Sequence, residues 1–241
     1  MKIAVELLLI LVLLLSVYSG YKKGLVMCIG AILAIILSLY MGNLLSDTFS
    51  HEAIPVVRPF ASGYMEGTEG IIGDKLNELL ASSEVRLSVD DALERYPDIE
   101  FELAENSFKE IGIYEETAKA MANEAIALSE RTGYSLPNAI VEVLCEKITY
   151  VVGFILFFLL ILIILTVLGN IFNLSFKIPE KDKLNDIGGL IAGAVTGLLF
   201  CSIAVWCLRF MGMLLPEEEM RKTLLTSLFM KFDFLSKFLP I

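Results

Sequence analysis

The chain has 241 residues, of which 56% are apolar and 20% are charged, and its mean hydropathy is +0.71 with a formal net charge of −10. Soluble domains average about 45–50% apolar and about 25% charged residues, and here the apolar excess is confined to four runs near the two chain ends. The composition therefore excludes one soluble domain and general disorder, and it indicates a protein that crosses the membrane several times. The single histidine also excludes sites that need two, such as Cys2His2 zinc centres.

The four apolar runs predict four transmembrane helices, because a helix needs about 17–25 apolar residues to span a bilayer. They cover residues 3–18, 25–45, 151–169 and 187–208. A tight polar turn over 20–24 is expected to join the first two runs as a helical hairpin. The third run is expected to end one unbroken helix over 138–171 that begins after a serine-proline start signal.

A cleaved signal peptide is the alternative interpretation of the first run. Lys2 precedes an apolar core, and residues 17–19 form a passable cleavage site. Two features favour a retained helix instead: Glu6 interrupts the start of the core, and a second apolar run follows directly after Lys22 and Lys23.

The positions of the lysines predict the orientation. Five lysines lie in the two short loops that precede the second and fourth runs, and short cytoplasmic loops are enriched in Lys and Arg. Both loops are therefore expected inside, which places both termini and residues 46–147 outside. Residues 43–147 hold 21 acidic and 8 basic residues, a net charge of −13, while the rest of the chain has a net charge of +3.

The long segment between the second and third runs has helical rather than strand periodicity. One apolar stripe begins at Ile71, Ser88 followed by Asp91 is typical of a helix start, and a helix over 114–131 is expected to stop at Gly133. The tail over 214–241 is also amphipathic. It is predicted to lie in the membrane interface, and docking on the outside segment is the alternative.

Small residues recur every four positions in two of the runs, and such stripes let helix backbones approach closely in lipid. We expect the second and fourth runs to pack on each other through them. A phosphate-binding glycine loop is disfavoured, because it needs a preceding strand and another spacing. The proposed packing residues are Gly189, Gly193 and Gly197 in the fourth run, and Gly30, Ala34, Ser38 and Gly42 in the second.

Residues that could perform chemistry are sparse. Glu6 is the one acidic residue within the four runs, and we interpret it as a boundary carboxylate, with an ion or proton role as the alternative. The acidic stretch over 90–105 lacks the spacing of a calcium loop and is expected to be a solvated face. The four cysteines are expected to be small buried residues. We therefore predict no catalytic residue, no metal and no cofactor.

Three stretches of the chain resemble the CvpA family of colicin V production proteins. The first joins Glu6 to the turn Lys23-Gly24-Leu25, the second extends from Pro179 through Asn185 into the glycine stripe, and the third is the amphipathic chain end at Leu239-Pro240. Gly188 departs from the pattern, which usually has leucine there, and residues 46–147 form a long insertion. The resemblance implies a four-span bacterial inner-membrane protein with a role in bacteriocin production or export, or in envelope upkeep, and without established chemistry.

These observations predict an all-α, four-span membrane protein. Its expected parts are a transmembrane hairpin over 1–45, an acidic helical extracytoplasmic insertion over 46–147, a second hairpin over 148–213 and an amphipathic helix over 214–241. The expected role is a non-catalytic scaffold in the cytoplasmic membrane, with a small oligomeric transporter or channel subunit as the alternative. The expected partners are the lipid bilayer and an envelope or secretion protein bound by the insertion; nucleic acid is not expected, and homo-oligomerisation stays open.

Overall fold

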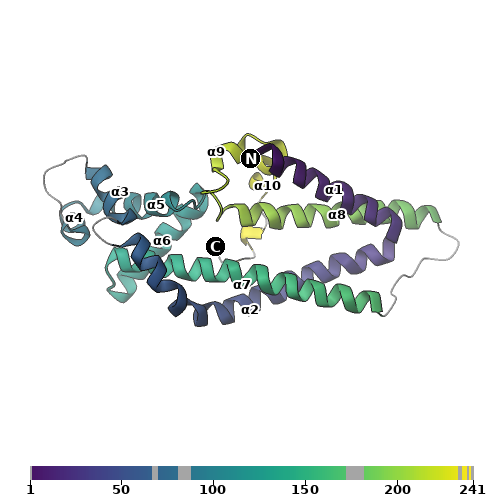
Figure 1. Cartoon of the computed structure of the whole chain (residues 1–241), viewed down its shortest axis with the longest axis horizontal. Helices are drawn as coiled ribbons and strands as arrows, with labels where there is room; N and C mark the ends of the chain where they lie inside the picture. The colour runs from purple at the N-terminus through teal and green to yellow at the C-terminus, as the bar shows by residue number, and fades with distance from the viewer. Residues whose placement is uncertain are drawn as a thin grey trace. The chain divides into compact units, whose positions relative to one another are not determined.

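The computed structural model describes residues 2–66, 70–80, 88–171, 182–232, 235–237 and 239. Throughout these residues the regular structure is helical and no strand occurs, which confirms the all-α prediction. Figure 1 shows the arrangement of the helices. They are α1 (Lys2–Lys23), α2 (Leu25–Met65), α3 (Ile71–Leu80), α4 (Val89–Arg95), η1 (Pro97–Ile99), α5 (Glu100–Glu110), α6 (Glu115–Thr132), α7 (Leu136–Ile171), α8 (Asp182–Leu208), α9 (Glu217–Arg221), α10 (Leu224–Lys231) and η2 (Leu235–Lys237).

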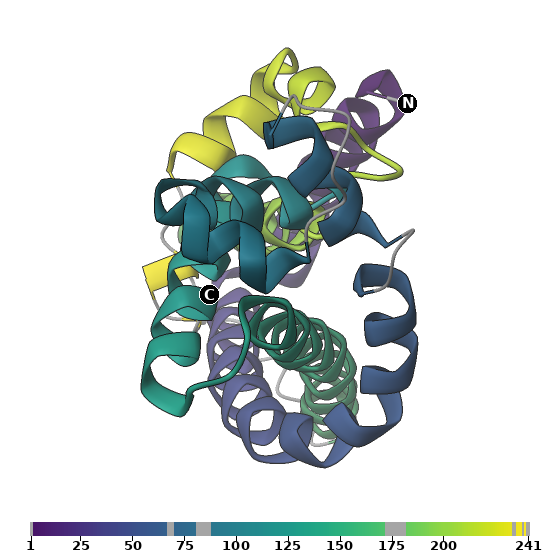
Figure 2. The same cartoon turned by 90° about the vertical axis from the view of Figure 1, so that its left-hand side faces the viewer.

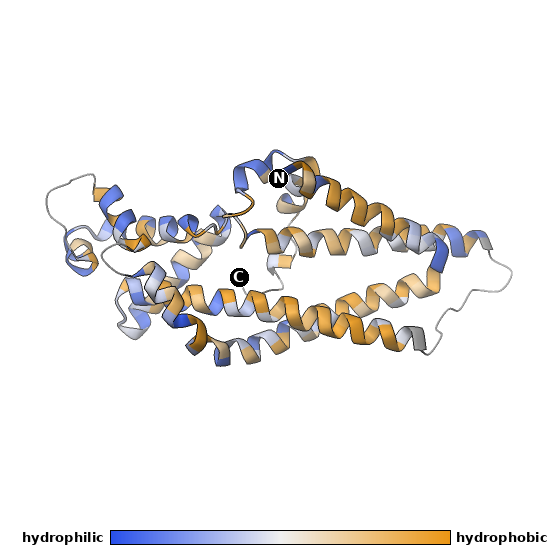
Figure 3. Cartoon of the chain, viewed as in Figure 1, coloured by the Kyte–Doolittle hydropathy of each residue, from blue (hydrophilic) through white to orange (hydrophobic). Residues whose placement is uncertain are grey.

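Four helices of the described part, α1, α2, α7 and α8, are long and apolar enough to cross a membrane. Figure 3 shows apolar residues along most of α1 and α8 and along large parts of α2 and α7. The four-span prediction is therefore confirmed, and α7 is the predicted unbroken helix. α2 is longer than expected, because it continues for twenty residues beyond the apolar run that ends at residue 45.

The chain divides into two compact units. Unit 1 consists of Met1–Asp47, Val152–Leu208 and Glu218–Pro240, and unit 2 contains Thr48–Val151 and Arg209–Glu217. α2 and α7 contribute residues to both units. Residues 209–217, which were expected at the end of the second hairpin and the start of the tail, cluster with unit 2.

Unit 1 contains two antiparallel helix pairs. α1 lies beside α8, and α2 lies beside α7 (Figure 1). The predicted polar turn over 20–24 is wrong, because α1 continues through Lys23 and Gly24 alone reverses the chain with φ of 82°. Glycine adopts this left-handed conformation without steric penalty, and Lys22 and Lys23 are favourable in the last turn because of the helix dipole.

Unit 2 has its own apolar core, formed by buried side chains from α2 through α7, including Met65, Leu76, Phe108 and Met121. The helix starts and stops expected in this segment are confirmed. The Ser88 hydroxyl accepts a hydrogen bond from the Asp91 N–H at the start of α4, and Gly133 ends α6 with φ of 73°. α2 contains Pro55 and Pro59 and curves along this part of its length (Figure 2), as expected where proline removes backbone hydrogen bonds.

The tail is not the single helix expected over 214–241. In the described part of the tail there are three short helices, α9, α10 and η2. The extended backbone of Thr223 (φ −91°, ψ 147°) separates α9 from α10, and α10 ends at Phe232, whose backbone is not helical. Although the tail has apolar periodicity, these two breaks divide it into separate short helices, of which α10 and η2 both contact α8.

Candidate functional site

The close contact between α1 and α8 is built on glycine. A Cβ atom at Gly193 would lie 2.5 Å from the Ser16 carbonyl oxygen and 2.9 Å from the Gly20 Cα atom. A Cβ atom at Gly189 would lie 2.4 Å from the Gly20 carbonyl oxygen, and a Cβ atom at Gly197 would lie 3.0 Å from the Ser16 Cβ. Backbone therefore packs directly on backbone at Gly189 and Gly193, one turn apart on α8, as small residues permit in a membrane.

The glycine stripe of α8 faces α1 rather than α2, so the predicted pairing of the second and fourth spans is wrong. In α2, a Cβ at Gly42 would lie 3.2 Å from the Phe158 backbone N of α7, and Gly153 of α7 lies against Ser46. Ser38 is buried, whereas Gly30 is exposed and a Cβ there would meet nothing within 4 Å. Residue spacing identified the glycine stripe of α8 and, in α2, the contact at Gly42 but not at Gly30; it did not indicate which helix lies opposite.

Two of the stretches that suggested the family resemblance meet at the turn between α1 and α2. Asn185 is 2% exposed, and its Cβ would be 3.9 Å from a Cβ at Gly24. A Cβ at Gly188 would lie 3.0 Å from the Leu25 side chain, so a leucine at that position would need Leu25 to move. Glycine at position 188, where the family pattern usually has leucine, thus coincides with a close contact to Leu25. Pro179 lies outside the described residues.

The third stretch meets the first through Glu6. The Glu6 Oε1 atom accepts a hydrogen bond from the Leu225 backbone N–H at 2.9 Å. Thr223 precedes α10 as its N-cap residue but makes no side-chain cap, and its hydroxyl donates to the Met220 carbonyl oxygen. Glu6 therefore satisfies a free N–H in the first turn of α10, where the helix dipole also favours a negative charge.

The side chains that surround the Glu6 contact with α10 are apolar. Leu9, Cys201 and Val205 form a buried cluster, and Leu225, Phe229 and Met230 of α10 pack against it. The Glu6 Oε2 atom is buried and has no hydrogen-bond partner among the described residues. Charge-assisted hydrogen bonds strengthen in such surroundings, so the contact with the Leu225 N–H is the main polar interaction that fixes this carboxylate.

Four other polar side chains of the spans are bonded within their own helices. The hydroxyl groups of Ser38, Thr166, Thr196 and Ser202 each donate to the carbonyl oxygen four residues earlier in their own helix, at 2.7–2.9 Å. Ser16 lies at the α1–α8 contact. Hydroxyls that are satisfied within their own helices do not form a continuous polar path.

In unit 2, residues 209–217 attach to the loop before α6. The Tyr114 N–H donates to the Arg209 carbonyl at 2.9 Å, and the Gly212 N–H donates to the Gly112 carbonyl at 2.8 Å. The Tyr114 hydroxyl donates to the Leu215 carbonyl at 2.7 Å. Gly112 has φ of 87°, and both glycines allow a close approach of the two backbones. This segment therefore forms an integral part of unit 2.

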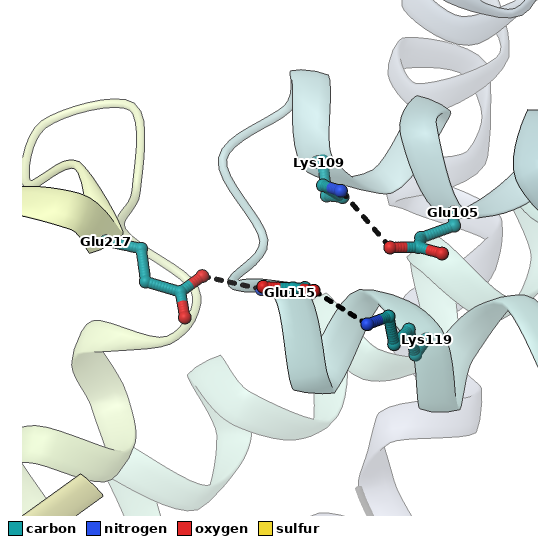
Figure 4. Close-up of polar contacts among 5 residues, drawn as sticks. All are labelled: Glu105, Lys109, Glu115, Lys119 and Glu217. Carbon is teal, nitrogen blue, oxygen red and sulfur yellow. Dashed lines mark hydrogen bonds and ion pairs between the residues drawn. The ribbon is translucent and has the colours of Figure 1, made fainter. Parts of the chain in front are cut away.

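Glu217 caps α6 in the same way that Glu6 caps α10. Its Oε2 atom accepts the Glu115 N–H at 2.7 Å (Figure 4), whereas the N-cap residue Tyr114 makes no side-chain cap. The Glu115 and Glu105 carboxylates pair with Lys119 and Lys109, respectively (Figure 4). Burial, and secondarily the Glu217 charge, raises the pKa of Tyr114 to about 12, so its hydroxyl stays a donor at neutral pH.

The other candidate groups do not form a site in the described part of the chain. The acidic stretch is largely exposed, although Glu105 is buried and Glu100 partly so, and burial together with the Glu130 charge raises the pKa of Glu100. His51 is exposed. The four cysteines are free, and Cys207 is the one that is not fully buried. No group of three metal-ligating side chains gathers within these described residues.

Sequence reasoning located Glu6 but missed its partner, and it missed Glu217 and Tyr114 altogether. A carboxylate that caps a helix distant in sequence leaves no periodic signal. For α6 a usable clue was the preceding tyrosine, which is a poor N-cap residue, whereas the threonine before α10 gave no such signal.

Comparison with known proteins gives one family match. Residues 123–233 match the family model described as Colicin V production protein. The match begins within α6 and ends just after α10, so it includes α7, α8 and the helix that Glu6 caps. No curated protein and no solved structure matches the chain.

Proposed function

We propose, from the match of residues 123–233 to the family model described as Colicin V production protein, that this chain works in the cytoplasmic membrane as a non-catalytic scaffold. In this role it assists bacteriocin production or export, or the upkeep of the cell envelope. The glycine contact and the Glu6 cap give it a defined membrane unit, and unit 2 supplies a second folded surface.

The continuity of α2 and α7 is the observation that best supports a scaffold. α2 begins with an apolar segment in unit 1 and continues without a break to Met65, which lies in the core of unit 2. α7 begins with residues of the same core and continues without a break into unit 1, where it ends at Ile171. Two unbroken helices thus connect a membrane unit to a unit with its own core. Such a connection suits a protein that holds a partner at the membrane.

The polar side chains of the spans give little support to the alternative of a small oligomeric transporter or channel. A transport path needs groups that can exchange partners with a moving ion or solute. Here four hydroxyls are bonded to their own helices, and Glu6 is bonded to Leu225. Their arrangement favours a structural role.

Unit 2 is proposed as the partner-binding part, with residues 46–147 and both termini on the extracytoplasmic side. The lysine distribution supports this orientation, because Lys22 and Lys23 are exposed at one end of α1. Exposed acidic residues cover α4 and the following turn, and they would favour a partner with a basic surface. The proposed partner is an envelope or secretion protein.

Site-specific photocrosslinking in the full chain tests this proposal. A photoreactive phenylalanine analogue would replace Tyr96 in unit 2, and in a matched variant it would replace Tyr40 in α2, since both side chains are well exposed. After irradiation of native membranes, Tyr96 should give a discrete protein adduct and Tyr40 should give mainly lipid adducts. Protein adducts from neither position would contradict the scaffold proposal.

Flux measurements separate the two functions. Purified full chain in proteoliposomes should show no sustained ion or solute flux above that of empty vesicles. Sustained flux that Glu6→Leu abolishes would support the transporter and would contradict the scaffold.

A further inference from the structure

α10 has two apolar faces, and unit 1 covers one of them. Leu225, Phe229 and Met230 pack against the cluster that contains Leu9 and Val205. Thr226, on the same side, has an exposed fraction of 0%. This side of α10 therefore belongs to the packed interior of unit 1.

The other face of α10 is apolar and exposed. Leu224, Leu228 and Phe232 are 76%, 44% and 72% exposed. Residues four apart lie on one face of a helix, so these three side chains form a continuous stripe. Lys222 and Lys231 near the two ends of the helix are exposed as well. An apolar stripe flanked by lysines is typical of a helix that lies in the lipid interface.

The contacts with α1 place α10 at the level of the bilayer. Glu6 lies four residues after the start of α1, which corresponds to about 6 Å along a helix of about 33 Å, close to the hydrocarbon thickness of about 30 Å. At this level the α1 side chains Leu7, Leu8 and Leu11 are more than half exposed, as is typical of a lipid-facing surface. Because Glu6 is bonded to Leu225, the start of α10 lies at a similar depth to these α1 side chains.

We propose that α10 is a lipid-embedded interfacial helix, held at its depth by the hydrogen bond between Glu6 and Leu225. Leu224, Leu228 and Phe232 enter the acyl region of the leaflet that contains the start of α1, and Lys222 and Lys231 reach the phosphate groups. Burial of each large apolar side chain in the acyl region favours insertion. The occupant of the exposed stripe is thus the bilayer itself.

Tryptophan fluorescence in the reconstituted full chain tests the proposal. Leu228→Trp and, separately, Leu224→Trp would be made in a Trp206→Phe background, which keeps an aromatic ring against Phe154. Glu218→Trp is the matched control, because Glu218 is exposed in α9 but lies outside the stripe. The vesicles would contain phosphatidylglycerol and phosphatidylcholine brominated either near the headgroup or near the acyl methyl end.

Lipid brominated near the headgroup should quench tryptophan at 228 and at 224 more strongly than lipid brominated near the methyl end, and the control should be quenched weakly by both. Blue-shifted but unquenched emission at both positions would show that protein, such as a second copy, covers the stripe. Red-shifted, unquenched emission would show that water covers it. Either result would overturn the proposal, and two test positions guard against one variant that fails to fold.

Discussion

The Glu6 carboxylate on α1 accepts the backbone N–H of Leu225 on α10 at 2.9 Å, across a sequence separation of 219 residues. Glu217 makes the equivalent contact in unit 2, where it accepts the Glu115 N–H at 2.7 Å from 102 residues away. Each carboxylate satisfies a helix that lacks a local side-chain cap. The tail of the chain is thus attached within unit 1 through Glu6, and residues 209–217 are attached within unit 2.

Replacing Glu6 by leucine should loosen α10. Loss of a helix cap costs about 0.5–2 kcal/mol, which corresponds to about 2–30-fold faster amide exchange if local opening controls it. Hydrogen exchange of the peptide that contains residues 224–231, measured on reconstituted full chain, should show this increase. Glu6→Gln keeps an acceptor oxygen and should cause a smaller increase.

Leu8→Ala is the control for this measurement, because Leu8 is 56% exposed on α1 and lies outside the buried cluster. In Leu8→Ala, amide exchange of α10 should equal that of the unchanged chain. Unchanged exchange in Glu6→Leu would show that apolar packing alone holds α10.

Substitution of Gly193 by leucine should separate α1 from α8. Even a Cβ there would meet backbone atoms of Ser16 and Gly20 at 2.5–2.9 Å, which side-chain rotation cannot relieve. Overpacking costs about 1–3 kcal/mol, and lipid offers no compensating gain from burial. Accumulation in membranes and resistance to unfolding in mild detergent should both fall.

Gly30→Leu is the matched control, because it makes the same glycine-to-leucine change in another span, at a position where a Cβ atom would meet nothing within 4 Å. It should accumulate like the unchanged chain. Equal damage from both variants would mean that the close contact between α1 and α8 does not limit stability.

Tyr114 should make the stability of the protein fall at alkaline pH. Its pKa is raised from 10.0 to about 12 in the folded state, first by burial and second by the Glu217 charge. The folded state therefore retains a proton that the unfolded state loses, so this contribution is complete below pH 10 and is lost as pH rises toward about 12. Tyrosinate absorbance should show a late-titrating component that Tyr114→Phe reduces by one tyrosine. A late component of unchanged amplitude in Tyr114→Phe would refute the assignment.

The orientation can be tested by cysteine labelling in a cysteine-free background. Glu94→Cys and Lys22→Cys both place the thiol at an exposed position, and Glu94 lies clear of the Ser88 cap of α4. An impermeant thiol reagent added to whole cells should label position 94 and spare position 22. The reverse pattern would invert the proposed topology.

Most of the helices could be predicted because their signals are local. Apolar length identified the four spans, Ser88 with Asp91 identified the start of α4, and Gly133 identified the end of α6. Two local predictions were wrong: the turn over 20–24 and the single tail helix. Both errors concern where a helix ends, which neighbouring elements influence: Gly20 stays helical against Gly189 and Gly193, and α10 begins where Glu6 caps it.

The sequence by itself determined the membrane class, the all-α fold and the glycine spacing of α8, since apolar length and helical period are properties of consecutive residues. Tertiary structure decided which surfaces meet. Glycine spacing is the same whichever helix lies opposite, so only the folded chain shows that Gly193 packs on Ser16 and Gly20, and Gly42 on Phe158. The same reason applies to Glu6, because a carboxylate can cap any free helix N-terminus within reach, and the packing of α10 on α1 and α8 brings Leu225 to it.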